Sequence, residues 1–114
     1  MVKVVINADF GGFGLSNEAI REYGRRKGLN LVAKVDDSPF VFFYKDEIKD
    51  ENIFSERDIP RDDLDLVAIV EEMGEASWNQ YSCLRVVEIP DDVDWFIQEY
   101  DGDEWIAERH RTWR

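Results

Sequence analysis

A cluster of glycines near the N-terminus constrains the fold of this chain more than any other feature. Three of its seven glycines fall within four consecutive residues: Gly11, Gly12 and Gly14. Residues 2–7 before them are apolar and β-branched, which predicts a largely buried strand. After them, Ser16 stands where a helix N-cap belongs, and Gly28 is placed to end the helix. The N-terminal quarter of the chain therefore predicts a strand, a tight turn and a helix.

The middle of the chain divides into shorter elements. The pattern predicts strands at residues 29–35, 40–44 and 84–89, a surface loop at 45–60 and a helix at 62–73. Gly74 supplies the end of this second helix. The loop is long enough to be a candidate lid over a binding site.

An Asp-Gly pair marks a hairpin near the C-terminus. Residues 95–100 and 105–110 flank the Asp-Gly-Asp-Glu segment at 101–104, and an Asp-Gly pair between alternating segments is typical of a hairpin. In register, Trp95, Ile97 and Glu99 would share one face, and Phe96, Gln98 and Tyr100 the other. The order of elements predicts an α+β fold: a mixed or mostly antiparallel sheet of about five to six strands, two helices on one face and a C-terminal β-hairpin.

Length and composition favour one domain over residues 1–114. Hydrophobic residues make up 44% of the 114 residues, which is enough for a core without metal or disulfide support. The single cysteine, Cys83, has no intramolecular partner, so a reducing compartment is expected. No apolar run approaches the roughly 18 residues of a membrane span, and residues 1–6 do not resemble a signal peptide. The prediction is a cytoplasmic protein without membrane contact.

The net charge of −12 is unevenly distributed along the chain. Residues 1–34 hold six basic and three acidic side chains, whereas residues 36–65 hold eleven acids and four bases. Residues 86–104 hold eight acids and no base. Direct nucleic-acid binding is therefore not expected, because most of the surface would repel phosphate. A small anionic ligand near the basic N-terminal segment or the C-terminal tail remains compatible with this distribution.

The glycine turn is the first candidate ligand-binding segment. A turn that leads into a helix N-terminus exposes backbone amides, and the helix dipole favours a phosphate or carboxylate there. The residues that would contribute are Gly11, Gly12, Phe13, Gly14 and Ser16. The alternative is a tight strand-to-helix connection in which Phe10 and Phe13 fill the core. The two interpretations are compatible with each other.

The C-terminal tail is the second candidate. Arg109 and Arg111 would point to one side of an extended strand, where with Trp105 they could grip an anionic or planar ligand. The alternative is solubilising charge at a chain end. His110, the only histidine, is the one imidazole available for a general base. The acidic turns match no metal-binding loop, so neither a metal nor a cofactor is predicted.

The sequence resembles a family of small phage and prophage proteins of unassigned function. The resemblance rests on residues 3–7 and 11–16, on the Ile-Pro-Arg-Asp-Asp run at 59–63, and on the Val-Glu-Ile-Pro-Asp-Asp-Val run at 87–93. The endings at 99–102 and 110–113 also agree. The resemblance spans most of the chain and implies an accessory phage protein that acts in the host cytoplasm.

Three function hypotheses follow from these observations. The leading one is a binding protein for a small anionic, nucleotide-like ligand, such as a host defence signal that it sequesters. The alternative is an acidic partner-binding protein or DNA mimic that inhibits a host enzyme. The third is a nucleotide hydrolase that uses His110. A homodimer is compatible with the four tryptophans and the aromatic hairpin.

Overall fold

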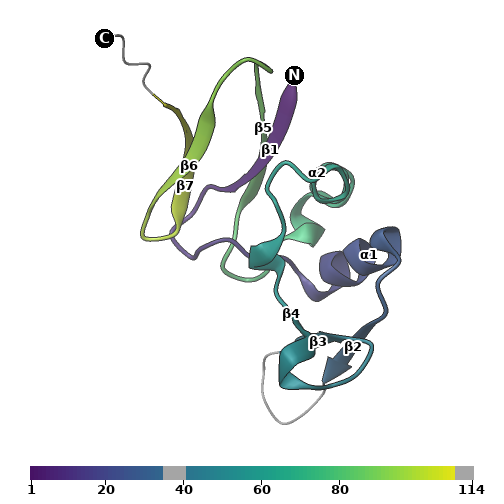
Figure 1. Ribbon diagram of the computed structural model, residues 1–114. Coiled ribbons are helices and arrows are strands. Elements are labelled where there is room, and N and C mark those ends of the chain that lie inside the picture. Colours follow the sequence, from purple (N-terminus) through teal and green to yellow (C-terminus); the bar gives the residue numbers. More distant parts are fainter. Residues whose placement is uncertain (35–40, 110–114) are drawn as a thin grey trace.

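The computed structural model describes residues 1–34 and 41–109 and confirms an α+β fold (Figure 1). The two α-helices are α1 (Asn17–Lys27) and α2 (Leu64–Met73). The strands are β1 (Val2–Asn7), β2 (Leu31–Lys34), β3 (Phe42–Lys45), β4 (Ile53–Phe54), β5 (Leu84–Ile89), β6 (Trp95–Tyr100) and β7 (Asp103–Glu108). All strand pairings are antiparallel, but they form three small sheets, β1-β5, β2-β3-β4 and β6-β7.

The β1-β5 ribbon lies at the centre of one half of the molecule and is covered on both faces. Val4 and Val5 point to opposite faces of β1, and both are fully buried. Val4 belongs to a small cluster shared with the β6-β7 hairpin, and Val5 to the main core shared with both helices. The β-branched run near the N-terminus therefore has no solvent-facing side, which explains why its pattern does not alternate.

The predicted hairpin and its two faces are confirmed, but the second strand is β7 at 103–108 rather than 105–110, because Asp101 and Gly102 alone form the turn. Asp101 and Gly102 have φ angles of 51° and 91°, the left-handed values that a two-residue turn of this kind requires. Trp95 and Ile97 pack toward β1 and β5, whereas Tyr100 on the other face is exposed. In Figure 1 the hairpin lies on the side of the β1-β5 ribbon away from the helices.

Helix α1 begins and ends as predicted, whereas α2 begins at Leu64, two residues after the predicted start at 62, because Asp63 is its N-cap. Ser16 caps α1 by accepting a hydrogen bond from the amide of Ala19, and Gly28 ends it with a φ of 71°. Asp63 caps α2 through the amides of Asp65 and Leu66. Helix α2 covers the β1-β5 ribbon, and α1 packs chiefly against α2, so the helices do not lie side by side on one sheet.

The segment predicted as a loop at 45–60 contains regular structure. It holds two 3-10 turns, η1 (Asp50–Asn52) and η2 (Glu56–Asp58), with β4 between them as the third strand of the β2-β3-β4 sheet. A third 3-10 turn, η3 (Gly74–Ser77), directly follows α2. Within the described residues, neither helix combines the length and the apolar character needed to cross a bilayer.

Candidate ligand-binding site

The glycine turn is a packing junction between three segments. A Cβ on Gly11 would lie 1.9 Å from the carbonyl oxygen of Tyr81, and one on Gly14 would lie 1.9 Å from the side-chain nitrogen of Asn79. A Cβ on Gly102, at the hairpin tip, would lie 2.5 Å from the amide nitrogen of Gly12. The glycines therefore allow residues 79–81 and the hairpin to approach the turn closely.

Ser16 has its polar groups engaged within the protein. Its hydroxyl donates to the carbonyl of Ala76 at 2.6 Å and accepts from the amide of Ala19 at 3.1 Å. Its own amide donates to the carbonyl of Ser77 at 2.9 Å. The Ser16 hydroxyl and amide thus fasten α1 to the η3 turn, and neither is free to hold a ligand.

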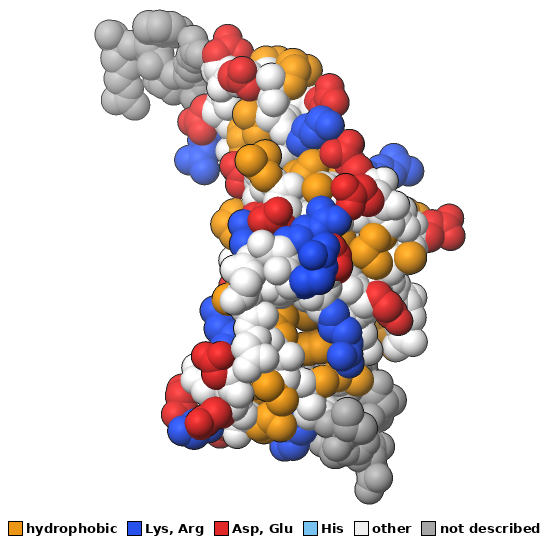
Figure 2. Space-filling view, turned by 90° about the vertical axis from the view of Figure 1, so that its right-hand side faces the viewer, with side chains coloured by type: hydrophobic (Ala, Val, Ile, Leu, Met, Phe, Trp, Pro, Cys, Tyr) orange, Lys and Arg blue, Asp and Glu red, His pale blue; other side chains and the backbone are white. Residues whose placement is uncertain are grey.

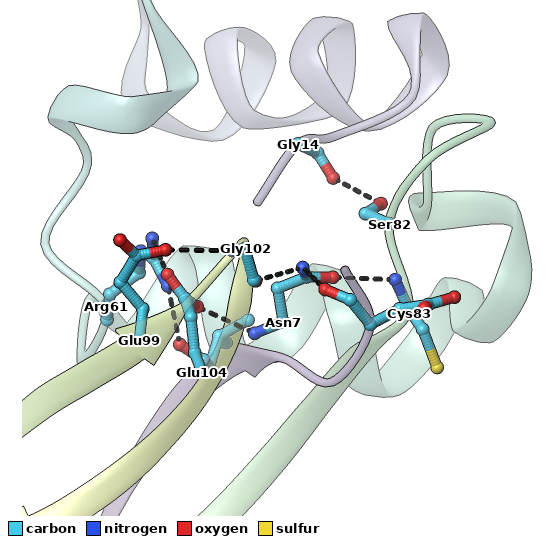
Figure 3. A network of polar contacts seen from close by, with 10 residues as sticks. Asn7, Gly14, Arg61, Ser82, Cys83, Glu99, Gly102 and Glu104 are labelled. Atoms are coloured by element: carbon cyan, nitrogen blue, oxygen red, sulfur yellow. Dashed lines mark hydrogen bonds and ion pairs between the residues drawn. The ribbon is translucent and has the colours of Figure 1, made fainter. Parts of the chain in front are cut away.

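Asn7 connects the glycine turn to the hairpin and to β5 (Figure 3). This side chain is fully buried, and its Nδ2 donates to the carbonyls of Asp9 and Gly102, each at 2.7 Å. Its Oδ1 accepts from the amide of Cys83 at 2.8 Å. The side-chain amide of Asn7 uses both of its N–H donors and one of its two acceptor lone pairs within the protein. Asn7 is therefore a structural residue.

A buried ion pair next to Asn7 fixes the hairpin to the helical half. The guanidinium of Arg61 donates to both carboxylate oxygens of Glu104 at 2.6 and 2.9 Å (Figure 3). It also stacks on Phe13, 3.6 Å from the centre of the ring. The same carboxylate accepts a hydrogen bond of 2.8 Å from the backbone N–H of Asn7. Phe13 is buried as the packing interpretation predicted, but Phe10 is 61% exposed and does not fill the core.

The predicted tail residues lie away from the glycine turn. Trp105 and Arg109 share the outer face of the hairpin, where Trp105 Nε1 donates to Gln98 and Arg109 lies 5.4 Å from the ring centre of Phe96. Arg109 is seven residues along the strand from Gly102, which corresponds to roughly 20 Å. Arg111 and His110 lie outside the described residues. The described residues therefore do not join the two candidate segments into one site.

The basic residues of α1 are also engaged. Arg25 and Arg26 pair with Glu22, and their hydrogen bonds lower the pKa of Glu22 to about 2. Lys27 bridges Asp63 and Asp65 at 3.1 and 2.9 Å, linking α1 to the start of α2 and raising its own pKa. Figure 2, which views the molecule from the α1 side, shows basic side chains next to acidic ones on this face. The positive balance of residues 1–34 is thus largely neutralised at the helix interface.

An open cavity lies beside the N-terminus of α1. We call it the α1 cleft; its volume is about 710 Å³. Its walls come from three places: the start of α1, strands β3 and β4 with the η2 turn, and residues 78–81. The lining residues used below are Ser16, Asn17, Phe42, Phe54, Glu56, Arg57, Trp78 and Tyr81. Of the residues predicted for a site, Ser16 alone lines this cleft.

The α1 cleft combines aromatic walls with unsatisfied polar groups. The Nε1 of Trp78 is buried and has no hydrogen-bond acceptor within the described residues. Arg57 is exposed and has no carboxylate within ion-pairing distance among residues 1–34 and 41–109. Burial raises the pKa of the Glu56 carboxyl, so part of the negative charge in the cleft is disfavoured. Such a cleft can accept a planar ligand that carries hydrogen-bond acceptors and negative charge.

A smaller cavity of about 290 Å³ adjoins the hairpin tip. It is lined by Gly12 and Phe13 from the predicted set, and by Arg61 and Glu104, which already satisfy each other. Arg57 borders both cavities. Because Arg61 and Glu104 pair with each other, these two groups are not free for a ligand in the smaller cavity.

Comparison with protein-family models, with curated proteins and with solved structures finds no match for this chain. Its function is therefore argued from its own residues. In the described part of the chain, no three histidine, cysteine or acidic side chains are grouped closely enough to hold a metal ion.

Sequence reasoning missed Trp78 and Arg57 as site residues. Both lie in short irregular segments, and what brings them together is the packing of β4 and η3 against α1, which no local pattern encodes. The available signal was the 45–60 segment, whose length marked it as a candidate for function. Residues 53–57 of this segment form one wall of the cleft.

Proposed function

We propose that the protein binds a small anionic, nucleotide-like ligand in the α1 cleft. The observation that carries the proposal is the buried indole N–H of Trp78, which has no acceptor within the described residues and belongs to a lining residue of an open cleft. An unpaired buried donor costs roughly 1–3 kcal/mol. A ligand that supplies the missing acceptor would recover this free energy.

The size and the walls of the cleft suit a planar group. A volume of about 710 Å³ is within the range of roughly 300–1,000 Å³ that is common for small-molecule sites. Phe42 and Tyr81 are half-exposed aromatic residues on its rim, at 45% and 56%. A heterocyclic base stacked on such rings would cover apolar surface that is otherwise in water.

The anionic part of the ligand would lie between Arg57 and the start of α1. The hydroxyl of Ser16 is engaged, but Asn17 and Glu18 follow it in the first turn, where helix amides lack intrahelical acceptors. The helix dipole adds partial positive charge at this end. Arg57 supplies a full charge with the geometry for a phosphate. The glycine turn thus contributes by positioning α1, and its amides are not part of the proposed contact.

The cleft favours binding over turnover. Its described lining contains one carboxyl, Glu56, and no histidine or cysteine. We extend the proposal to the setting that the sequence resemblance implies. In that setting, a phage accessory protein would bind a host signalling nucleotide without hydrolysing it and so lower its free concentration. The amount of nucleotide sequestered would depend on the amount of protein present.

Calorimetry with a panel of linear and cyclic mono- and dinucleotides tests the proposal. At least one member should bind saturably, and Arg57→Gln should weaken it by about tenfold or more. Arg109→Gln is the matched control, because it removes one exposed arginine from the hairpin and should change affinity by less than about twofold. Silence across the panel, or equal losses in the two variants, contradicts the α1 cleft as the site.

A further inference from the structure

The outer face of the β6-β7 hairpin is an aromatic surface that no described element covers. Tyr100 and Trp105 are 73% and 43% exposed, and the register places them diagonally across the two strands. Phe96 extends the same face toward Arg109. The opposite face of the hairpin packs on β1 and β5, so this face is free of the protein's own core. Adjacent exposed aromatic side chains of this kind are typical of interaction surfaces.

The tip end of this face is bordered by acidic side chains. Residues 86–104 contain eight acids and no base, and Asp101 and Asp103 lie at the hairpin tip next to Tyr100. Asp103 is directly opposite Tyr100 in the strand register. Arg109, which pairs with Asp94 at 3.6 Å, is at the far end of the face. Asp101 and Asp103 have no ion-pair partner within the described residues. The cations beside the tip, Arg57 and Arg61, line the cavity with Glu99 and Glu104, which belong to the other face of the hairpin.

We propose that this hairpin face docks a basic surface of another protein, rich in arginine and lysine. Arginine guanidinium groups stack on aromatic rings and pair with carboxylates, and both groups are adjacent here. A second copy of this chain fits less well, because it would bring the same acidic tip against an equally acidic one. The proposal is independent of the α1 cleft, which is formed by other residues.

A titration of the labelled protein with a hexa-arginine peptide, followed by NMR, tests the inference. We expect shifts concentrated at Gln98, Tyr100 and the indole of Trp105. Trp105→Ala should weaken the affinity for the peptide by about tenfold. Asp101→Asn with Asp103→Asn should weaken it by about fivefold while keeping the turn, since Asn-Gly suits this turn as well as Asp-Gly.

The matched control is Asp50→Asn with Glu51→Gln, which removes the same charge from the exposed η1 turn. It should change affinity by less than about twofold. Equal losses in the two charge-neutralised variants, with shifts spread over every acidic segment, overturn the proposal because they indicate non-specific attraction. A dimer of the wild-type protein in ultracentrifugation that Trp105→Ala converts to monomer also overturns it, in favour of a second copy.

Discussion

Arg61 and Glu104 form a two-pronged ion pair between residues 43 positions apart, and this pair joins the hairpin to the helical half of the molecule. The two side chains are only 17% and 10% exposed. Each residue of the pair makes one further contact. Glu104 accepts a hydrogen bond from the backbone N–H of Asn7, and Arg61 stacks on the ring of Phe13. The small sheets are thus held together by a shared polar centre as well as by apolar packing.

Removing one partner of this pair should strongly destabilise the fold. Glu104→Ala leaves the buried Arg61 guanidinium without its carboxylate, and we expect a loss of about 3 kcal/mol in the free energy of unfolding. Glu108→Ala, at an exposed position on the same strand, should cost less than about 0.5 kcal/mol. Urea denaturation of both variants measures the difference. Similar losses would show that the ion pair does not fix the hairpin.

The close approach at the glycine turn predicts a difference between two glycines that share a left-handed conformation. Gly102 and Gly28 have φ angles of 91° and 71°, so alanine at either position costs about 1 kcal/mol in backbone strain. Only the Cβ of Gly102→Ala would also meet backbone atoms, at 2.5 Å. We expect Gly102→Ala to lose about 3 kcal/mol and Gly28→Ala about 1 kcal/mol in thermal or urea unfolding. Equal losses of stability in the two variants would contradict the close packing of Gly102 against the glycine turn.

The ion pairs of Glu22 predict a loss of stability in acid. The folded pKa of Glu22 is about 2, below its ordinary value of 4.5, because Arg25 and Arg26 hydrogen-bond to the carboxylate. Its stabilising contribution is therefore present above about pH 4.5 and is lost as the pH falls toward 2. The free energy of unfolding should decline more steeply over this window in the wild type than in Glu22→Gln. Parallel curves would contradict the prediction.

The raised pKa of Glu56 predicts that the affinity for an anionic ligand rises in mild acid. Burial raises the pKa of this carboxyl, so it becomes neutral at a higher pH than an exposed glutamate does. Loss of its charge removes repulsion toward an anionic ligand in the α1 cleft, and affinity should increase as the pH falls through this pKa. Glu56→Gln should bind more tightly at neutral pH and lose this part of the pH dependence. Calorimetry across pH, with a nucleotide identified from the panel, checks both.

Local sequence signals predicted the elements of this fold well. Ser16, Gly28 and the Asp101-Gly102 turn all act at the positions expected for caps and hairpins, because such features depend on a few neighbouring residues. The alternation of Trp95 and Phe96 also identified the two faces of the hairpin.

Long-range arrangement was not predictable in the same way. The β1-β5 ribbon and the β6-β7 hairpin are joined by the side chains of Asn7, Arg61 and Glu104 rather than by a continuous ladder. The role of the glycine turn depends on Asn79 and Tyr81, which lie more than sixty residues away in the sequence. The α1 cleft arises from the same long-range packing, so the local sequence pattern gave no signal for Trp78.

The indole N–H of Trp78 gives the most direct test of the proposed function. In a protein labelled with ¹⁵N, the Trp78 resonance should move along a saturable curve on addition of a nucleotide that binds, because its buried donor gains an acceptor. The indole resonance of Trp105, which already donates to Gln98, should stay in place. A binding nucleotide that leaves Trp78 unmoved, or a panel in which no nucleotide shifts it at millimolar concentration, contradicts a ligand site in the α1 cleft.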